Sequence, residues 1–434
     1  AIRSVWTRVQ AAAEAANDAT DACGFTALIG YEYSAGPNGS NLHRNVIFRG
    51  AEVTPLPITY FEAPTAAALW DQLEAQCLNA GKGCDVLAIP HNSNWSNGNL
   101  FDVESTPVAT DDPAALEASR QAALRRARLE PLIEVYQHKG DSECASGFSG
   151  FQPDEFCAFE KQRVLAGSNE PSVLTPADDC GDGTGTGAMI GIGCLSRRDF
   201  LRGILREGLR SEAAIGANPF KLGVIASTDT HAALAGNVAE KDFPGHLGLH
   251  DDTPEDRLES PTLTPGGVLE SPGGLAAVWA TENSREAIFD ALRRRETYGT
   301  SGPRMAVRFF GGFGLSDAAC AEPNLLELAY AGGVPMGGDL PAAPSGASPR
   351  FIVQAVQASD GHALDRIQVI KGWVDLETGE THEKIYTVVE SAYSATVNES
   401  TCEVSAGGLP ELCAFWTDPD FNPLVAAYYY ARVL

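Results

Sequence analysis

The sequence predicts an α/β fold, a barrel of alternating strands and helices, followed by a smaller β-rich domain. Two observations predict the barrel: short apolar runs alternate with helical segments, and acidic or histidine residues follow several of these runs. After residue 300 the pattern changes to segments rich in β-branched and aromatic residues. We therefore expect one domain over residues 1–331 and a β-rich domain over residues 332–434.

Four apolar runs in the first domain have the composition of strands that are buried on both faces, as in a parallel sheet. They are residues 25–30, 86–89, 132–136 and 222–226. Helical segments precede them at residues 6–16, 66–80, 113–129 and 199–215. A further helix is expected over residues 283–295, with Asn283 as its cap and Glu286 three residues later.

Two long stretches show little periodicity. Residues 142–193 contain three cysteines and are expected to form a surface loop tied by disulfides. Residues 237–273 are rich in Asp, Pro and Gly and come soon after Asp229 and His231. A loop of this length is either a lid over a site or a plain surface excursion.

The β-rich domain begins at a Gly and Pro-rich boundary over residues 332–348. Strand-like segments follow at residues 351–357, 367–370, 384–389 and 424–433. Gly, Pro and Asp residues between them indicate turns.

Composition narrows the range of partners. The 434 residues carry a formal net charge of −26, which repels nucleic acids and anionic membranes, so neither is an expected partner. No run approaches the roughly 20 apolar residues that span a bilayer, so no membrane span is expected. A small anionic substrate is compatible with this charge, because metal ions in a pocket can reverse the local field.

The ten cysteines include no C-x-x-C pair, which argues against structural zinc and dithiol redox chemistry. Disulfides are the better explanation, and they indicate the periplasm or the exterior of the cell. Cys23 and Cys320 would form a long-range pair or stay free if the close pairs form. The close pairs are Cys77 with Cys84, Cys144 with Cys157, Cys180 with Cys194, and Cys402 with Cys413.

Five residues of metal-binding type lie in or directly after apolar runs: Glu32, His91, Glu134, Asp229 and His231. The carboxyl ends of parallel strands converge on one crevice, where such side chains would be ligands for Zn²⁺, Mn²⁺ or Fe²⁺. A carboxylate beside a buried strand is costly unless it is paired or bound to metal. Lys139 offers Glu134 the simpler alternative of an ion pair.

Asp229 and His231 form the sharpest of these signals. Residues two apart in an extended segment point the same way, so both side chains can reach one metal or two adjacent metals. The alternative is an Asp cap beside an incidental histidine. His91 alone is equally explained as an ordinary hydrogen-bonding group.

His43 and Arg44 follow a turn rich in Gly and Asn and precede a short apolar segment. Arginine is suited to a bidentate grip on phosphate and histidine to proton transfer. The alternative is a solvated loop. The sequence has no G-x-S-x-G elbow, no G-x-x-x-x-G-K-[ST] loop and no H-E-x-x-H helix, so it offers no motif for those chemistries.

Taken in order, the motifs resemble the PHP (polymerase and histidinol phosphatase) superfamily. More closely, they resemble a bacterial envelope family of PHP-like proteins catalogued as a domain of unknown function. The resemblance spans most of the chain. The motifs include GYEYS at 30–34, LHRNV at 42–46, IPHNSN at 89–94, EVYQ at 134–137 and STDTH at 227–231.

The resemblance implies a distorted (β/α)₇ barrel that holds two or three divalent transition metals (Mn, Zn or Fe). It also implies hydrolysis of a small phosphomonoester or phosphodiester by a metal-bound hydroxide. By matching position, Glu32, His91, Asp229 and His231 would be metal ligands, as would Glu134. The residues that would face the substrate are His43, Arg44, Asn92 and Lys139.

One departure from the family pattern stands out. The pattern begins with an H-x-H strand and a strand ending in Asp-His, and neither precedes Glu32, so we expect both upstream of Ala1. Two other functions stay open. One is an amidohydrolase-like metal hydrolase of amides or non-phosphate esters, which would use a bridging lysine or carboxylate. The other is a non-catalytic binding module of the cell envelope.

Overall fold

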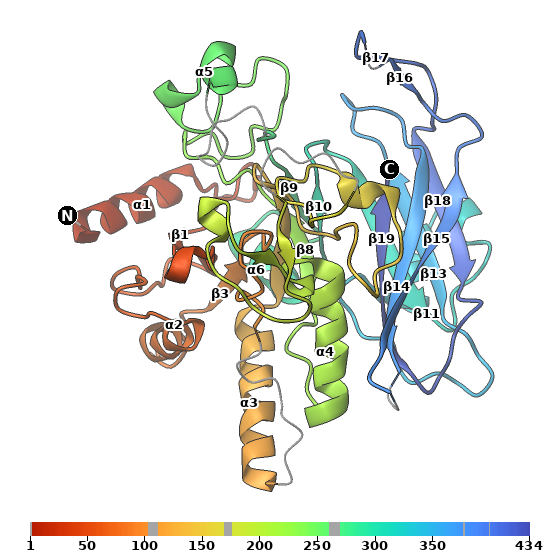
Figure 1. Ribbon diagram of the computed structural model, residues 1–434, viewed down its shortest axis with the longest axis horizontal. Helices are drawn as coiled ribbons and strands as arrows, with labels where there is room; N and C mark the ends of the chain where they lie inside the picture. Colours follow the sequence, from red (N-terminus) through yellow and green to blue (C-terminus); the bar gives the residue numbers. More distant parts are fainter. Residues whose placement is uncertain (1, 103–111, 169–175, 260–269, 376–377, 399) are drawn as a thin grey trace. The chain divides into compact units, whose positions relative to one another are not determined.

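The computed structural model describes residues 2–102, 112–168, 176–259, 270–375, 378–398 and 400–434, and Figure 1 shows its ribbon. The chain divides into two compact units. The first contains residues 1–148 and 154–299, and the second contains residues 149–153 and 300–434. The boundary expected after residue 331 falls inside the second unit, within its helix α7 (Leu325–Gly332).

The main helices of the first unit form where the periodicity predicts them. Thr65 and Asp112 cap α2 and α3 through their side chains. Ser284 caps α6 by accepting a hydrogen bond from the backbone NH of Ala287, whereas the expected cap, Asn283, donates to the carbonyl of Cys23. The helices are α1 (Ile2–Ala16), α2 (Ala66–Leu73), α3 (Pro113–Leu129), α4 (Leu201–Ile215), the short α5 (Pro254–Glu259) and α6 (Arg285–Arg293).

The strands of the first unit fall into small sheets. One has the order β1-β2-β3 and is antiparallel throughout, a second has the order β5-β4-β8, and β9 pairs with β10. Within the second sheet, β4 and β8 run parallel. These strands are β1 (Gly30–Tyr33), β2 (Arg44–Phe48), β3 (Val86–Pro90), β4 (Leu132–Gln137), β5 (Gly140–Asp141), β8 (Gly223–Ala226), β9 (Leu275–Val278) and β10 (Thr297–Thr300).

The predicted (β/α)₇ barrel is wrong: the described residues form separate sheets of two to four strands and no closed barrel. The first departure lies between β1 and β2. A parallel pair needs a crossover of a dozen or more residues, usually a helix, whereas only a short loop joins Tyr33 to Arg44, so these strands pair antiparallel. The strand expected at residues 25–30 begins only at Gly30.

The ends of three strands nevertheless lie together. Strand β3 lies beside β4, and the backbone NH of Asn92, just after β3, donates to Glu134 of β4 at 2.8 Å. Ser227, the residue after β8, donates its hydroxyl to the same carboxylate. Polar residues that follow β3, β4 and β8 therefore gather in one region of the first unit.

Two apolar clusters hold these sheets. Val46, Phe48 and Tyr33 of the first sheet are buried with Trp6 of α1. Leu87 and Ile89 of β3 pack in a second cluster that also includes Leu132 of β4, Ile225 of β8 and Phe289 of α6. Because one face of β3 contributes to each cluster, its apolar run is continuous, as its sequence shows.

The second unit is built mainly of antiparallel strands. One sheet has the order β12-β11-β13-β18 and another has the order β15-β14-β19. A small hairpin joins β16 (Val397–Asn398) to β17 (Glu403–Val404). The larger strands are β11 (Ala306–Gly312), β13 (Arg350–Val356), β14 (Arg366–Val374), β15 (Thr381–Glu390), β18 (Glu411–Thr417) and β19 (Ala426–Val433), and β12 is Val334–Pro335.

Four disulfides are present, and three are the expected short-loop pairs: Cys77–Cys84, Cys144–Cys157 and Cys180–Cys194. The expected pair of Cys402 with Cys413 is wrong, because Cys413 bonds to Cys320 across 93 residues. Cys23 and Cys402 are free. Spatial proximity explains why Cys413 pairs with Cys320. Cys413 lies in β18 near the turn that contains Cys320, whereas Cys402 lies in an exposed turn before β17.

Over the described ranges, no helix combines the length and the apolar character that crossing a membrane requires.

Candidate metal centre

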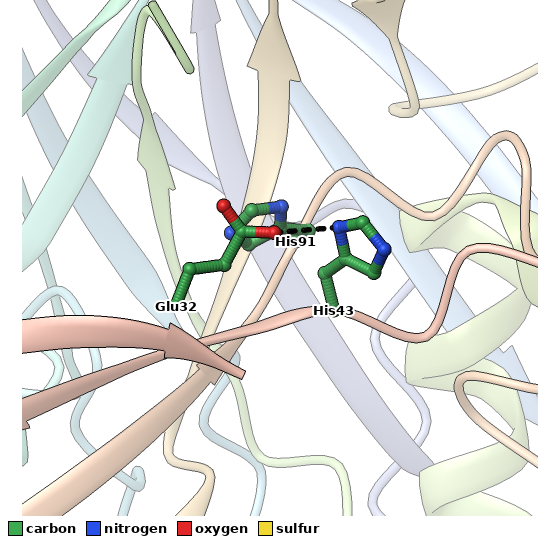
Figure 2. Close-up of side chains that lie close together, drawn as sticks. All are labelled: Glu32, His43 and His91. Carbon is green, nitrogen blue, oxygen red and sulfur yellow. Dashed lines mark ion pairs between the residues drawn. The ribbon is translucent and has the colours of Figure 1, made fainter. Parts of the chain in front are cut away.

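Glu32, His43 and His91 form a first group of potential metal ligands. One ligand atom from each lies within 4.8 Å of the other two. Figure 2 shows the carboxylate of Glu32 directed at the imidazole of His43, and Nδ1 of His43 lies 2.7 Å from Oε1 of Glu32. The rings of His43 and His91 lie edge to face with centroids 5.7 Å apart.

The pairing of β1, β2 and β3 positions this group. Glu32 of β1 lies opposite Asn45 of β2, and Asn45 lies opposite Ile89 of β3. The backbone NH of His91, just after β3, donates to the carbonyl of His43 at 3.2 Å. The register of a three-stranded antiparallel sheet therefore brings together three residues that are widely separated in sequence.

His91 has the features of a prepared ligand. It is 1% exposed, and its Nε2 contacts Oδ1 of Asn45 at 3.0 Å. Because that amide oxygen only accepts, Nε2 carries the proton and Nδ1 offers a lone pair. Nδ1 is buried and has no hydrogen-bond partner. A buried, unpaired nitrogen is costly, and a bound metal would satisfy it.

Electrostatics keep Glu32 ionised. Burial alone would raise the pKa of Glu32, but the hydrogen bond from His43 and the nearby His91 lower it to about 2. Ser34 also donates its hydroxyl to Oε1 of Glu32 at 2.8 Å. The carboxylate is therefore charged at neutral pH, as metal binding requires.

His138, Asp229 and His231 form the second group, again with one ligand atom from each within 4.8 Å of the others. His138 follows β4, and Asp229 and His231 follow β8, the strand that pairs parallel with β4. Nε2 of His138 lies 3.2 Å from Oδ2 of Asp229. The carboxyl ends of a parallel pair thus converge as the sequence analysis expected, although in a small sheet.

The backbone at Asp229 is left-handed, with φ of 50°. The segment is therefore not extended, and the expected side-by-side projection of Asp229 and His231 is not how they meet. Asp tolerates this conformation better than most residues, and non-glycine residues held in it cluster at functional sites. His138 is buried, Asp229 is half-buried and His231 is exposed.

Lys139 lies beside this second group and contacts its carboxylate. Its Nζ lies 2.5 Å from Oδ2 of Asp229 and 5.9 Å from the centroid of the Trp95 ring. Burial would raise the pKa of Asp229, but Lys139 and His138 hold it far below its ordinary value. The expected ion pair of Lys139 with Glu134 is replaced by one with Asp229.

The two groups influence each other electrostatically. The charge of Asp229 raises the pKa of Glu32, and His91 in its protonated form lowers the pKa of Asp229. The carboxylates of Glu32 and Asp229 are thus close enough to repel. Two adjacent groups of this kind match the donors that bind a pair of divalent ions.

Glu134 and Asn92 are placed as scaffold. Oε2 of Glu134 accepts from the backbone of Asn92 at 2.8 Å and from Gln137 at 3.0 Å, while Oε1 accepts from Ser227. The Asn92 side chain donates to the carbonyl of Gly140 and accepts from Ser142. Both side chains are fully buried, and their hydrogen bonds connect the ends of the strands that the ligand residues follow.

Arg44 is not brought to either group. Its Nε lies 2.5 Å from Oε1 of buried Glu130, its NH1 donates to the carbonyl of Leu42, and Trp70 donates to the same Glu130 oxygen. The side chain is 4% exposed. Arg44 therefore belongs to a buried ion pair between β2 and the end of α3.

The sequence analysis did not single out His138, His246 or Glu270. His138 directly follows β4 and precedes Lys139, so its position at a strand end was the available signal. His246 and Glu270 lie in the stretch of residues 237–273, where no periodicity marked them. Nδ1 of His138 contacts Oε2 of Glu270 at 2.8 Å.

Imidazole nitrogens and carboxylate oxygens gathered at strand ends are the donor set of divalent transition-metal centres. The chain belongs to the family described as "Protein of unknown function (DUF3604)", whose model matches residues 1–434. No curated protein matches the chain, and neither does any solved structure.

Proposed function

We propose that the first unit is a metal-dependent hydrolase of small anionic phosphoesters that works in the periplasm or outside the cell. The observation that carries the proposal is that the first unit holds two ligand groups, Glu32–His43–His91 and His138–Asp229–His231, and that Lys139 pairs with Asp229 of the second. The disulfides support the compartment, since such bonds persist in oxidising environments. The motif resemblance to the PHP superfamily supports the substrate class.

Divalent ions in such a centre supply Lewis acidity toward a phosphoryl oxygen and acidify water. The residues of the chain would contribute three further effects. Glu32 and Asp229 are already ionised and bring two negative charges to the ligand groups. Lys139 offers an ammonium group for a non-bridging oxygen, where charge develops in phosphoryl transfer. Where Glu32 and His91 hold the ion, His43, which is 18% exposed, would be suited to move a proton, whereas His91 is buried.

A hydrolase of amides or non-phosphate esters that uses the same ions is the second candidate. It would use the carboxylate of Asp229, which Lys139 contacts at 2.5 Å, as the bridging group of that class. Substrate preference separates the two candidates. Arg44 does not help to choose between the two candidates, because it pairs with Glu130 and is not brought to the ligand groups.

The test is an activity screen of the protein after chelation and reloading with Mn²⁺, Zn²⁺ or Fe²⁺. We expect aryl phosphate monoesters or diesters to be cleaved, with activity lost in chelator and in Asp229→Ala, His231→Ala. A matched control is Asp360→Ala, His362→Ala, which removes an exposed pair of the same D-x-H spacing in the second unit. Cleavage of amides or lactones without phosphoesters would favour the second candidate.

A further inference from the structure

A third group of ligand-type side chains lies beside the two groups of the proposed centre. It contains His138, His246 and Glu270, with one ligand atom from each within 4.8 Å of the others. His246 and Glu270 come from opposite ends of the stretch 246–270, and both reach the residue that follows β4. The functional proposal gives neither of them a role.

His246 offers an unused nitrogen. Its Nε2 lies 2.8 Å from the carbonyl oxygen of Ser271. A carbonyl only accepts, so Nε2 carries the proton and Nδ1 offers a lone pair. The residue is 1% exposed, and its Nδ1 is buried without a hydrogen-bond partner. A buried acceptor left in this state is destabilising, which calls for a ligand.

His138 lies close to both His246 and Glu270. The rings of His138 and His246 have centroids 4.4 Å apart, and Nδ1 of His138 lies 2.8 Å from Oε2 of Glu270. Nε2 of His138 is turned instead to Asp229, at 3.2 Å. If Nδ1 of His138 binds a cation, Nε2 keeps a proton and donates to Asp229, the usual carboxylate support of a metal-bound histidine.

We propose that His138, His246 and Glu270 bind a divalent cation of the zinc type, in addition to the ions of the proposed hydrolytic centre. The site rests on the proposed function in so far as it takes His138 from the second ligand group, where Asp229 and His231 remain as ligands of the hydrolytic centre. Two imidazoles and one carboxylate are a common protein donor set for Zn²⁺, and they leave a fourth position for water or substrate. The cation would fasten both ends of the 246–270 stretch to the end of β4.

The test is zinc stoichiometry. Wild-type protein and the variants His246→Gln and Glu270→Gln are stripped with chelator, reloaded with Zn²⁺, freed of excess ion and subjected to elemental analysis. Glutamine at 246 keeps a donor for the Ser271 carbonyl, so the anchoring of the segment is retained. The matched control is His250→Gln, which replaces an exposed histidine of the same segment.

We expect each of the two variants to hold about one Zn²⁺ per chain fewer than wild type, and the control to match wild type. The same loss is expected when His246→Gln is added to the Asp229→Ala, His231→Ala variant. An unchanged zinc count in both His246→Gln and Glu270→Gln would overturn the site and leave Glu270 as a group that only orients His138. The count is independent of catalysis: absent phosphoesterase activity with the zinc loss intact would overturn the proposed function alone.

Discussion

Nε2 of His138 lies 3.2 Å from Oδ2 of Asp229, although 91 residues separate them in the chain. The parallel pairing of β4 with β8 creates this contact, because both residues come just after the ends of those strands. Lys139 reaches the same carboxylate oxygen at 2.5 Å. The structure thus joins a cation, an imidazole and a carboxylate at one point, and the predictions below test what each contributes.

Lys139→Ala is expected to lower kcat/KM for an aryl phosphate by about 100-fold, since removing one group that stabilises transition-state charge typically costs this much. Metal content should stay at the wild-type level, because Lys139 is not among the ligand groups. Steady-state kinetics and elemental analysis of the same sample give both values. Lys384→Ala, which breaks an exposed ion pair with Asp420 in the second unit, is the control and should leave both unchanged. A rate equal to wild type in Lys139→Ala would remove this residue from substrate binding.

Glu134→Gln should mainly affect stability, whereas Glu32→Gln should mainly affect metal binding. Glu134 accepts hydrogen bonds on both of its oxygens. In Glu134→Gln the amide NH₂ group would point at other hydrogen-bond donors, so the substitution should lower the free energy of unfolding by about 1–3 kcal/mol. Glu32→Gln should instead reduce metal content, and its cost to the stability of the metal-free protein should be smaller than that of Glu134→Gln, because the Glu32 side chain is 31% exposed and solvent screens its ion pair. Urea unfolding in chelator measures the first effect. Equal stability of both metal-free variants would show that Glu134 does not act as the scaffold described above.

Arg44→Met is expected to destabilise the protein by about 1–3 kcal/mol, because it removes one donor to buried Glu130 while Arg126, 3.3 Å away, remains to compensate part of its charge. Arg49→Met is the control, since the Arg49–Asp290 pair is 38% and 48% exposed and should contribute less than about 1 kcal/mol. Urea unfolding of both variants provides the comparison. A loss for Arg44→Met no larger than for the control would contradict the buried pair.

The pH dependence of stability should include a contribution from Asp199. Burial raises its pKa to about 6, despite hydrogen bonds from Ser96, Gly98 and Ser196. The folded protein therefore holds a proton that the unfolded chain releases near pH 4, so this contribution is full below about pH 4 and is lost as the pH rises through about 6. The free energy of unfolding of metal-free wild type, relative to Asp199→Asn, should fall by up to about 3 kcal/mol over that window. A difference that stays constant between pH 4 and pH 7 would contradict the raised pKa.

Alkylation before reduction should label Cys23 and Cys402 and no other cysteine, because the remaining eight form disulfides. Peptide mapping should then recover Cys320 linked to Cys413. Replacing Cys320 by Ser should destabilise the second unit by about 4 kcal/mol on the chain-entropy model for so long a loop. Recovery of a Cys402–Cys413 peptide would support the sequence-based pairing instead.

Local elements followed from the sequence because their signals are local. The helical pattern of residues 113–129 predicted α3 at its observed bounds, and apolar runs located β3, β4 and β8 to within a residue. The direction in which strands pair is not local. The run of alternating helices and strands favoured parallel pairing everywhere, but the short connection after Tyr33 sets β1 and β2 antiparallel.

The site was predictable to a similar extent. Carboxylates and histidines at strand ends were recognised, so Glu32, His91, Asp229 and His231 were expected, and they lie in two ligand groups. The partners of Arg44 could not be read, because Glu130 is 86 residues away and its side chain is buried only by the folded core. His246 and Glu270 carry no spacing signal, since their meeting depends on the path of a long irregular segment.

The central claim is that the ligand groups of the first unit hold divalent metal, and elemental analysis of purified protein tests it most directly. Wild type and the Asp360→Ala, His362→Ala control should each contain at least two equivalents of transition metal per chain. The Asp229→Ala, His231→Ala variant should lose at least one of them. Absence of metal from all three proteins, after purification without chelator and reloading with Mn²⁺, Zn²⁺ or Fe²⁺, would contradict the metal centre and favour a binding module of the cell envelope.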